Sequence, residues 1–149
     1  MVEAMQAWSA YRRLREQVDT EVARELERAA GLSMPDYEIL ATLVELTSPD
    51  DCIRVRGLAE RMLWPHSRLS RQLGRMEQRG LIAREACERD GRGDDVVLTD
   101  AGRRAYTDAT PGHHAAIRAC FTDLLSDRQL QTLVAIERQI ADRGAAAPR

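Results

Sequence analysis

The chain has 149 residues, of which 44% are hydrophobic and 31% charged, a composition typical of a soluble protein with one compact core. No apolar run approaches the ~18 residues that span a bilayer. Charged residues at Glu3, Arg12 and Arg13 interrupt the N-terminal segment, which argues against a signal peptide. We therefore expect a cytoplasmic protein with no membrane partner.

The net charge of −2 hides an uneven distribution. Residues 1–53 carry 5 Arg and 11 acidic residues, residues 54–104 carry 12 Arg and 8 acidic residues, and residues 105–149 carry 5 of each. All 22 basic residues are Arg, a side chain that makes planar, bidentate contacts. The positive charge is therefore local, as in a protein that places cations against phosphates on one surface.

The first third of the chain predicts two helices. Ser33, followed by Pro35 and Asp36, carries the N-cap signature of the second helix, which residues 48–51 end. Its expected buried face comprises Tyr37, Leu40, Ala41 and Val44, with Leu43 as a further candidate. The first helix is long, ends at Gly31 and has an apolar stripe at helical spacing: Trp8, Tyr11, Val18, Val22 and Leu26.

The middle of the chain follows the order of a helix-turn-helix with a β-hairpin wing. The expected elements are a short strand at 53–55, a third helix through Leu58, Ala59 and Met62, a turn at 63–65, a fourth helix from Pro65 to about Arg79 before Gly80, and wing strands at 81–84 and 96–98 joined by the loop 89–95.

Two further helices are expected after the wing. Thr99 or Asp100 caps the fifth helix, which Pro111-Gly112 should kink or break. Ser126 and Gln129 resemble a capping box for the last helix. The first helix and the last two are amphipathic, so they either pack on each other within one chain or build a dimer interface. A dimer fits better, because two linked helices that read DNA gain affinity as a pair.

The expected fold class is mainly α with a small β-hairpin wing, in which a winged helix-turn-helix lobe is joined to a helical dimerisation region. Within one intertwined domain, residues 1–32 form the N-terminal dimerisation helix, residues 33–100 the DNA-binding lobe, and residues 101–149 the C-terminal dimerisation helices.

The fourth helix has the chemistry of a helix that reads DNA. On a helical wheel, Leu69, Leu73 and Met76 form the core face, and the arginines lie opposite it. An α-helix fits the major groove, where Arg can donate twice to guanine and short Ser side chains allow close approach. The candidate contacts on this helix are Ser67, Arg68, Ser70, Arg71 and Arg75.

The wing loop supplies a second candidate contact. Arg89 and Arg92 could enter the adjacent minor groove, which attracts arginine. Asp90, Asp94 and Asp95 would repel phosphate unless paired, and Asp90 is expected to orient an arginine. Gly91 and Gly93 permit a tight loop. A solvated, charged hairpin is the alternative.

The ordered set of these segments resembles the MarR family of bacterial winged-helix transcriptional regulators. The likeness extends over nearly the whole chain, although Leu63-Trp64-Pro65 replaces the Gly and Ser/Thr usual around the turn. The segments that carry the likeness are Leu58-Ala59-Glu60-Arg61, Ser67 to Arg71, Met76 to Ile82 with Arg84, and Asp90-Gly91-Arg92 followed by Val96 to Thr99 and Gly102.

The resemblance implies an obligate homodimer on a palindromic operator, with the fourth helix in the major groove and Arg92 in the minor groove. It implies a regulator, which we expect to be a repressor, and an effector pocket between the DNA-binding lobe and the dimer helices. Because the family senses phenolic and other small aromatic compounds, we expect such a ligand. Candidate pocket residues, for which ordinary packing is the alternative, are Trp8, Tyr11, Arg15, Met34, Tyr37 and His114.

Rival functions have less support in the sequence. Cys87 beside the wing could act as an oxidant switch, and a winged helix could instead bind protein. We expect neither an enzyme nor a metal or cofactor, because no phosphate loop, metal motif or nucleophile elbow is present. The odd number of cysteines, at 52, 87 and 120, argues against a disulfide framework.

Overall fold

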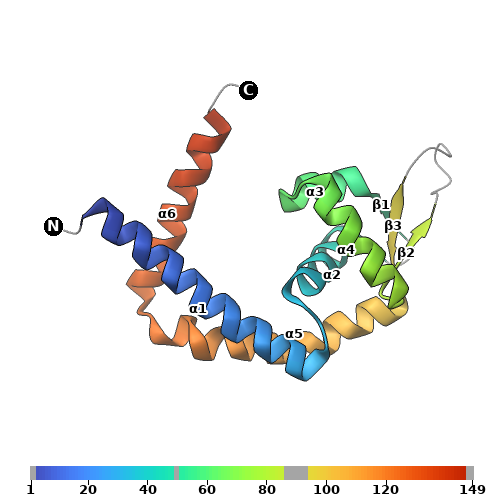
Figure 1. The fold of residues 1–149 in the computed structure, drawn as a ribbon, viewed down its shortest axis with the longest axis horizontal. Coiled ribbons are helices and arrows are strands. Elements are labelled where there is room, and N and C mark those ends of the chain that lie inside the picture. Colours follow the sequence, from blue (N-terminus) through green and yellow to red (C-terminus); the bar gives the residue numbers. More distant parts are fainter. Residues whose placement is uncertain (1–2, 49–50, 86–93, 147–149) are drawn as a thin grey trace. The chain divides into compact units, whose positions relative to one another are not determined.

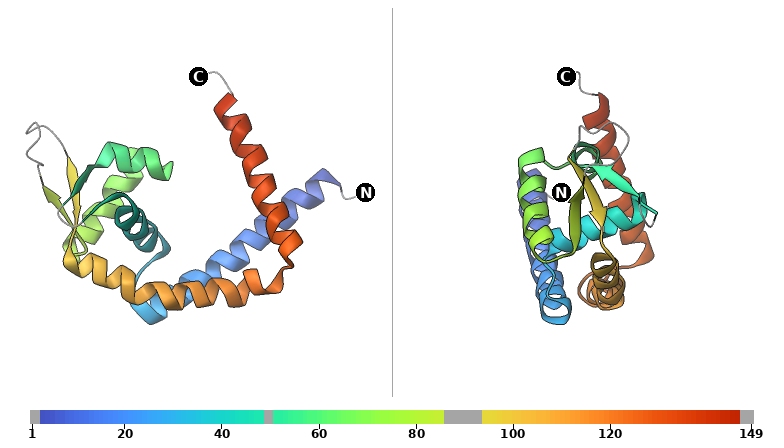
Figure 2. Two further views of the ribbon diagram at one scale, coloured as in Figure 1. Left: turned by 180° about the vertical axis from the view of Figure 1, so that it is seen from behind. Right: turned by 90° about the vertical axis from the view of Figure 1, so that its right-hand side faces the viewer.

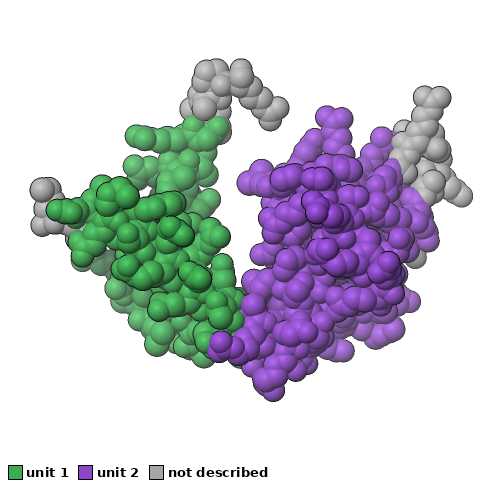
Figure 3. All heavy atoms as spheres, in the orientation of Figure 1, with its two compact units in different colours: residues 1–22, 114–149 green, residues 23–113 purple. Residues whose placement is uncertain are grey.

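The computed structural model describes residues 3–48, 51–85 and 94–146 (Figure 1). The chain divides into two compact units (Figure 3). One unit, Ala23–His113, is called the helix-turn-helix unit below. The other combines Met1–Val22 with His114–Arg149 and is called the outer unit.

The helix-turn-helix unit contains the elements expected from the middle of the chain. Three strands form an antiparallel sheet in the order β1-β3-β2, with Ile53 and Arg84 both opposite Val96. The strands stand together at one edge of the unit, and α2, α3 and α4 lie beside them (Figures 1 and 2). The elements are α2 (Met34–Leu46), β1 (Cys52–Arg54), α3 (Val55–Met62), α4 (His66–Gln78), β2 (Ile82–Glu85) and β3 (Asp95–Leu98). The expected mainly α class with a winged helix-turn-helix is confirmed.

The start of α2 forms as its sequence predicts. Helix α1 (Ala4–Ala30) ends before Gly31, whose φ of 62° is the left-handed value that glycine adopts without a Cβ clash. The Ser33 hydroxyl then accepts from the Asp36 N–H, and the Asp36 carboxylate accepts from the Ser33 N–H. This capping box pairs two amide groups that would otherwise lack partners at the helix start.

The core of the helix-turn-helix unit is built on the predicted face of α4. Leu69, Leu73 and Met76 are fully buried and belong to one cluster with residues of α2, α3 and the sheet. Within α2, Tyr37, Leu40 and Leu43 are buried as expected, Ala41 and Val44 are half-buried, and Ile39, which the expected face did not include, is fully buried. Burial of the apolar face fixes the rotation of α4 and therefore which of its residues face solvent.

Helix α5 (Asp100–Cys120) corrects one expectation, because it continues through Pro111 without a break. Proline removes one backbone hydrogen bond and normally interrupts a helix. Here the flanking turns are anchored: Ala109 and His113 are buried, and the Thr110 hydroxyl hydrogen-bonds Tyr37 at 2.9 Å. At the start of the helix, the Thr99 hydroxyl accepts from the Gly102 N–H, so Thr99 is the cap.

The outer unit contains the N-terminal part of α1, the later part of α5, a 3₁₀ turn η1 (Thr122–Leu124) and α6 (Asp127–Ala146). The predicted capping box of α6 is present, since Ser126 and Gln129 exchange side-chain hydrogen bonds with each other's N–H groups. Among the described residues, no helix has the length and apolar character of a membrane span. Large apolar side chains are exposed along α1 and α6, namely Met5, Trp8, Tyr11, Leu14, Leu133, Val134, Ile136 and Ile140.

Candidate nucleic-acid interface

The solvent side of α4 carries the predicted contact residues. Ser67, Arg68, Arg71 and Arg75 are exposed and together are called the arginine face. They lie opposite the three buried apolar residues, as the wheel indicates. Ser70 differs from them because it is half-buried and already engaged by another side chain. The arginine face is therefore a row of cations on a helix whose other side is fixed in a core.

The turn before α4 has an unusual backbone. Leu63 has φ 56° and ψ 37°, a left-handed conformation that costs L-residues about 1–2 kcal/mol. Its side chain is 90% exposed. The next residue, Trp64, packs against the core cluster, and Pro65 precedes α4 without a side-chain cap. The turn therefore pairs an inward-packed Trp64 with an exposed Leu63 in a left-handed conformation.

Arg68 is held against this turn. Its guanidinium carbon lies 3.8 Å from the centroid of the Trp64 ring, a cation–π contact. Arg68 thus has a defined position although its side chain is exposed.

A buried carboxylate ties α4 to the start of α2. Asp36 is only 2% exposed and accepts hydrogen bonds from Gln72 Nε2 at 2.6 Å and from Arg79 Nη1 at 2.6 Å. Arg79 also donates to the Gly31 carbonyl. Burial alone would raise the pKa of Asp36, but the Arg79 guanidinium and the Ser33 N–H together lower it below its ordinary value. Asp36 is therefore a buried anion with charged and neutral donors.

The same carboxylate reaches the arginine face through Gln72. The Gln72 amide donates to Asp36 and accepts from Arg75 Nη2. Arg75 is thereby oriented by a relay that begins at a buried charge. The sequence reasoning predicted Arg75 and missed Asp36, Gln72 and Arg79. Gln72 could have been noticed as a polar residue beside Met76 at the edge of the buried face.

The wing is connected to α4 by Arg84. Its Nη2 donates to the Ser70 carbonyl at 2.9 Å and hydroxyl at 3.1 Å, and its Nη1 pairs with Asp94 at 2.9 Å. Asp94, expected to repel phosphate unless paired, is paired. Arg89, Asp90, Gly91, Arg92 and Gly93 lie outside the described residues, so their roles stay predictions.

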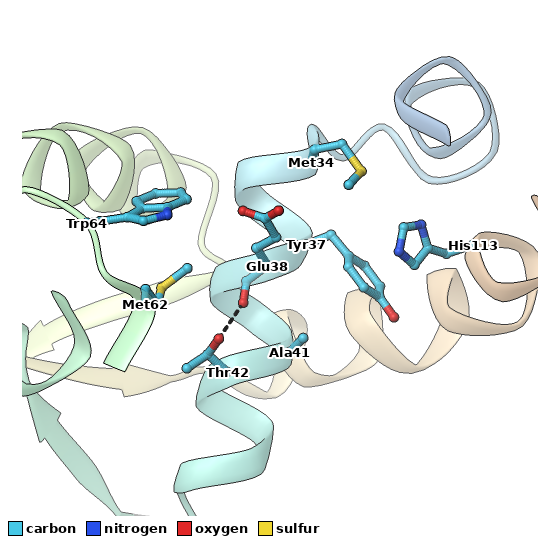
Figure 4. Close-up of a pocket in the computed structure, with 8 residues that line it drawn as sticks. All are labelled: Met34, Tyr37, Glu38, Ala41, Thr42, Met62, Trp64 and His113. Carbon is cyan, nitrogen blue, oxygen red and sulfur yellow. Dashed lines mark hydrogen bonds between the residues drawn. The ribbon is translucent and has the colours of Figure 1, made fainter. Parts of the chain in front are cut away.

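A pocket of about 470 Å³ opens on the helix-turn-helix unit between α2, the turn and α5 (Figure 4). The Tyr37 and His113 rings are in contact, tilted by 45° with centroids 4.0 Å apart, and burial raises the pKa of the Tyr37 hydroxyl. Aromatic and thioether side chains therefore dominate one wall, beside a carboxylate. The lining residues are Met34, Tyr37, Glu38, Ala41, Thr42, Met62, Trp64 and His113.

Two of the six predicted pocket residues, Met34 and Tyr37, line this pocket, and His113 lines it next to the predicted His114. The other four belong to the outer unit. There, the Trp8 and Tyr11 rings lie 5.8 Å apart, and Arg15 pairs with Asp19. The placement of these four at an effector site stays a prediction.

Comparison with known proteins identifies the family of this chain. A model of the MarR family matches residues 30–93. The solved structure of AbsC, a MarR family transcriptional regulator from Streptomyces coelicolor, shares 34% identity over 99% of each chain with a TM-score of 0.86. The chain belongs to the MarR family. It is a DNA-binding transcriptional regulator with a winged helix fold, and members of this family are DNA-binding proteins rather than enzymes.

A second MarR family relative was solved with nucleic acid. Sco3205 from Streptomyces coelicolor, in complex with DNA, shares 32% identity, covers 95% of this chain and 89% of its own, and has a TM-score of 0.85. CouR from Rhodococcus jostii RHA1, bound to p-coumaroyl-CoA, shares 24% identity over 87% of each chain with a TM-score of 0.71, which supports the fold alone. A comparison with curated proteins finds no match.

Two of the three cysteines lie in the described residues. Cys52, on β1, is disulfide-bonded. Cys120 is a half-buried free thiol. Cys87, the candidate oxidant switch, lies outside the described residues. No group of three or more His, Cys, Asp or Glu residues within the described ranges could hold a metal ion.

Proposed function

We propose that this MarR family protein is a sequence-specific regulator that binds a palindromic operator as a homodimer in the cytoplasm and represses transcription until a small aromatic or phenolic effector releases it. The arginine face of α4 carries the proposal. Its side chains are exposed, and Arg68 and Arg75 are held by Trp64 and Gln72. The DNA complex of the relative Sco3205 supports the same use of the fold.

Arg71 and Arg75 are proposed to read bases in the major groove, and Ser67, Arg68 and Ser70 to contact bases or phosphates. Helix α4 positions these groups over about two turns of one face. Arg89 and Arg92 of the wing are proposed to contact the adjacent minor groove. Ser70 would contact DNA by donating its hydroxyl proton, while its carbonyl and hydroxyl oxygens still accept from Arg84.

The homodimer is proposed to form through the outer helices. Within one chain, Trp8 of α1 and Ile140 of α6 are exposed at 52% and 67%. Burying such apolar surface in a second copy would remove it from water. Two reading helices about 34 Å apart, one turn of DNA, would then match a palindrome. Sedimentation at micromolar concentration should give a dimer, and a monomer would contradict this part.

The effector is proposed to bind in the pocket lined by Met34 and Tyr37. Apolar walls with a few polar groups suit a small aromatic molecule. Trp8, Tyr11, Arg15 and His114 belong to the outer unit, and their part in effector binding stays a prediction from the sequence. The wall residue Glu38 makes a phenol, which can donate a hydrogen bond, a better match than an aromatic acid.

The decisive experiment is selection of bound sequences from random DNA. We expect an enriched palindrome, and binding that weakens steeply as salt rises because phosphate contacts release counterions. Arg71→Ala should lose about 1–3 kcal/mol on the selected site if it makes a good base contact. Equal losses on the selected site and on random DNA would assign Arg71 to phosphate, and the absence of any enriched sequence would reject sequence-specific binding.

A further inference from the structure

One side chain belongs to both the pocket and the surroundings of the arginine face. The Trp64 ring lines the pocket near Met62 and Glu38 (Figure 4). The same ring supports the guanidinium of Arg68 at 3.8 Å. Movement of this ring would therefore alter the pocket and the position of Arg68 together.

Contacts other than the one with Arg68 also hold Trp64 in the turn. The Trp64 N–H donates to the Ala59 carbonyl at 3.0 Å and closes the end of α3. Trp64 also occupies the position before the N-cap of α4, where an apolar residue staples the helix start to its first turn. With no side-chain cap at Pro65, this packing is what sets the entry into α4.

Support from Trp64 matters because an exposed arginine has many rotamers. Ordering such a side chain on DNA costs conformational entropy, and a surface that orders it beforehand lowers that cost. Arg71 provides the contrast: it lies on the same face, and within the described residues it has no hydrogen bond, ion pair or ring contact. The two arginines therefore differ in preorganisation on one helix.

We infer that Trp64 is a positioning residue that holds Arg68 for DNA and transmits occupancy of the pocket to it. The inference rests on the proposed function, since it requires DNA at the arginine face and a ligand in the pocket. It links the pocket to the arginine face through the Trp64 indole ring and the Arg68 guanidinium, all within the helix-turn-helix unit.

A double-mutant cycle on the selected DNA site tests the first half. Trp64→Leu, which keeps an apolar side chain without an indole face, should weaken binding roughly three- to tenfold, the range of a partly exposed cation–π contact. In an Arg68→Ala background the same substitution should change affinity less than twofold. In the matched Arg71→Ala background it should keep its full effect.

The outcomes separate the inference from the function on which it rests. Equal losses from Trp64→Leu with and without Arg68 would overturn the inference and leave the proposed function intact. If Arg68→Ala itself leaves binding unchanged, both the Arg68 contact and the inference fall. Should Trp64→Leu not fold, Trp64→Phe replaces it. In addition, Arg68→Ala in a Trp8→Phe protein should alter the Trp64 fluorescence, and unchanged emission would count against the contact.

A filled pocket tests the second half. Thr42 lines the pocket near Met62, and Thr42→Phe would place a ring there (Figure 4). It should weaken specific DNA binding when Arg68 is present and have less than a twofold effect in Arg68→Ala. Thr42→Val, which removes the hydroxyl without filling the space, is the control and should bind like the parent. Equal loss from Thr42→Phe in both backgrounds would overturn the coupling.

Discussion

Helices α3 and α4 end in the same hydrogen-bond pattern, but a different type of residue occupies the left-handed position in each. At the end of α4, the N–H groups of Gly80 and Leu81 donate to the carbonyls of Glu77 and Met76 at 2.9 and 3.0 Å. At the end of α3, those of Leu63 and Trp64 donate to the carbonyls of Glu60 and Ala59 at 3.3 and 3.0 Å. Both are Schellman motifs, which require a left-handed residue.

The residue in the left-handed position sets the cost of each end. Gly80, at φ 73°, adopts this conformation freely, whereas Leu63, at φ 56°, brings a Cβ into conflict with its own backbone. The helix that leads to the wing ends without strain, and the helix that leads into the arginine face ends with it. Among the described residues of this unit, Leu63 is the non-glycine residue with a positive φ, so this backbone strain lies at the turn that positions Trp64.

The largest loss of stability is expected at Gly102, which packs closely against the Leu81 backbone just after the end of α4. A Cβ at Gly102 would lie 2.0 Å from the Leu81 carbonyl oxygen, which is backbone and cannot move aside easily. Gly102→Ala should therefore destabilise the protein by about 3 kcal/mol, the upper range for overpacking, in denaturant unfolding. Gly112→Ala in the same helix meets nothing within 4 Å and should be neutral or slightly stabilising. Equal changes in stability from Gly102→Ala and Gly112→Ala would contradict a role for close packing at Gly102.

Asp36 anchors the end of α4 from the other side, through Arg79. Asp36→Asn should cost about 2 kcal/mol, because it removes the charge from a buried, hydrogen-bonded site. The exposed pair Arg56–Glu60 on α3 serves as the control, and Glu60→Gln should cost no more than about 1 kcal/mol. If urea unfolding gives Asp36→Asn and Glu60→Gln similar losses of unfolding free energy, burial of the Asp36 pair contributes little to stability.

The lowered pKa of Asp36 also predicts a pH dependence. A carboxylate with a folded pKa below its unfolded value contributes stability that is present above the unfolded pKa and lost as the pH falls through the folded pKa. The unfolding free energy should fall in this acidic range more steeply in the parent than in Asp36→Asn. Parallel pH curves for the two proteins would assign the acid sensitivity to other groups.

Substitutions that exchange Gly and Leu between positions 80 and 63 should change stability by smaller amounts and in opposite directions. Gly80→Leu should cost about 1–2 kcal/mol through its backbone alone, since a Cβ there meets nothing within 4 Å. Thermal unfolding monitored by circular dichroism measures the change. A neutral Gly80→Leu would indicate that the left-handed conformation is not strained in this motif.

The reciprocal change is the smallest. Leu63→Gly should stabilise the protein by about 0.5–1 kcal/mol, because the exposed Leu63 side chain loses little packing when the strain is relieved. A loss of stability would mean that Leu63 has a packing role beyond the contacts described, and the comparison of the two ends would then fail.

Apolar periodicity predicted most of this fold because burial imposes the helical repeat on the sequence. Leu69, Leu73 and Met76 located the core face of α4, and Gly31 and Gly80 located two helix ends. These features depend on residue type and local spacing, which a single sequence displays.

Features that depend on contacts distant in sequence were missed. Asp36 was assigned as a capping residue, which it is, but its bonds to Gln72 and Arg79 join residues 36 and 43 positions apart. Pro111-Gly112 was expected to kink or break α5, and the break is wrong because buried residues on both sides, Ala109 and His113, keep the helix continuous. Leu63 carries no local signal for a left-handed backbone, since its conformation follows from the turn and from Trp64.

Gln72 has a consequence for the natural variation of this protein. Its amide donates to Asp36 with one atom and accepts from Arg75 with the other, so the side chain is oriented and cannot be replaced by a group that only accepts. Glu at position 72 would set two carboxylates against each other. Positions 36 and 72 are therefore expected to vary together, and Glu at position 72 should occur in homologues only together with a neutral residue at position 36.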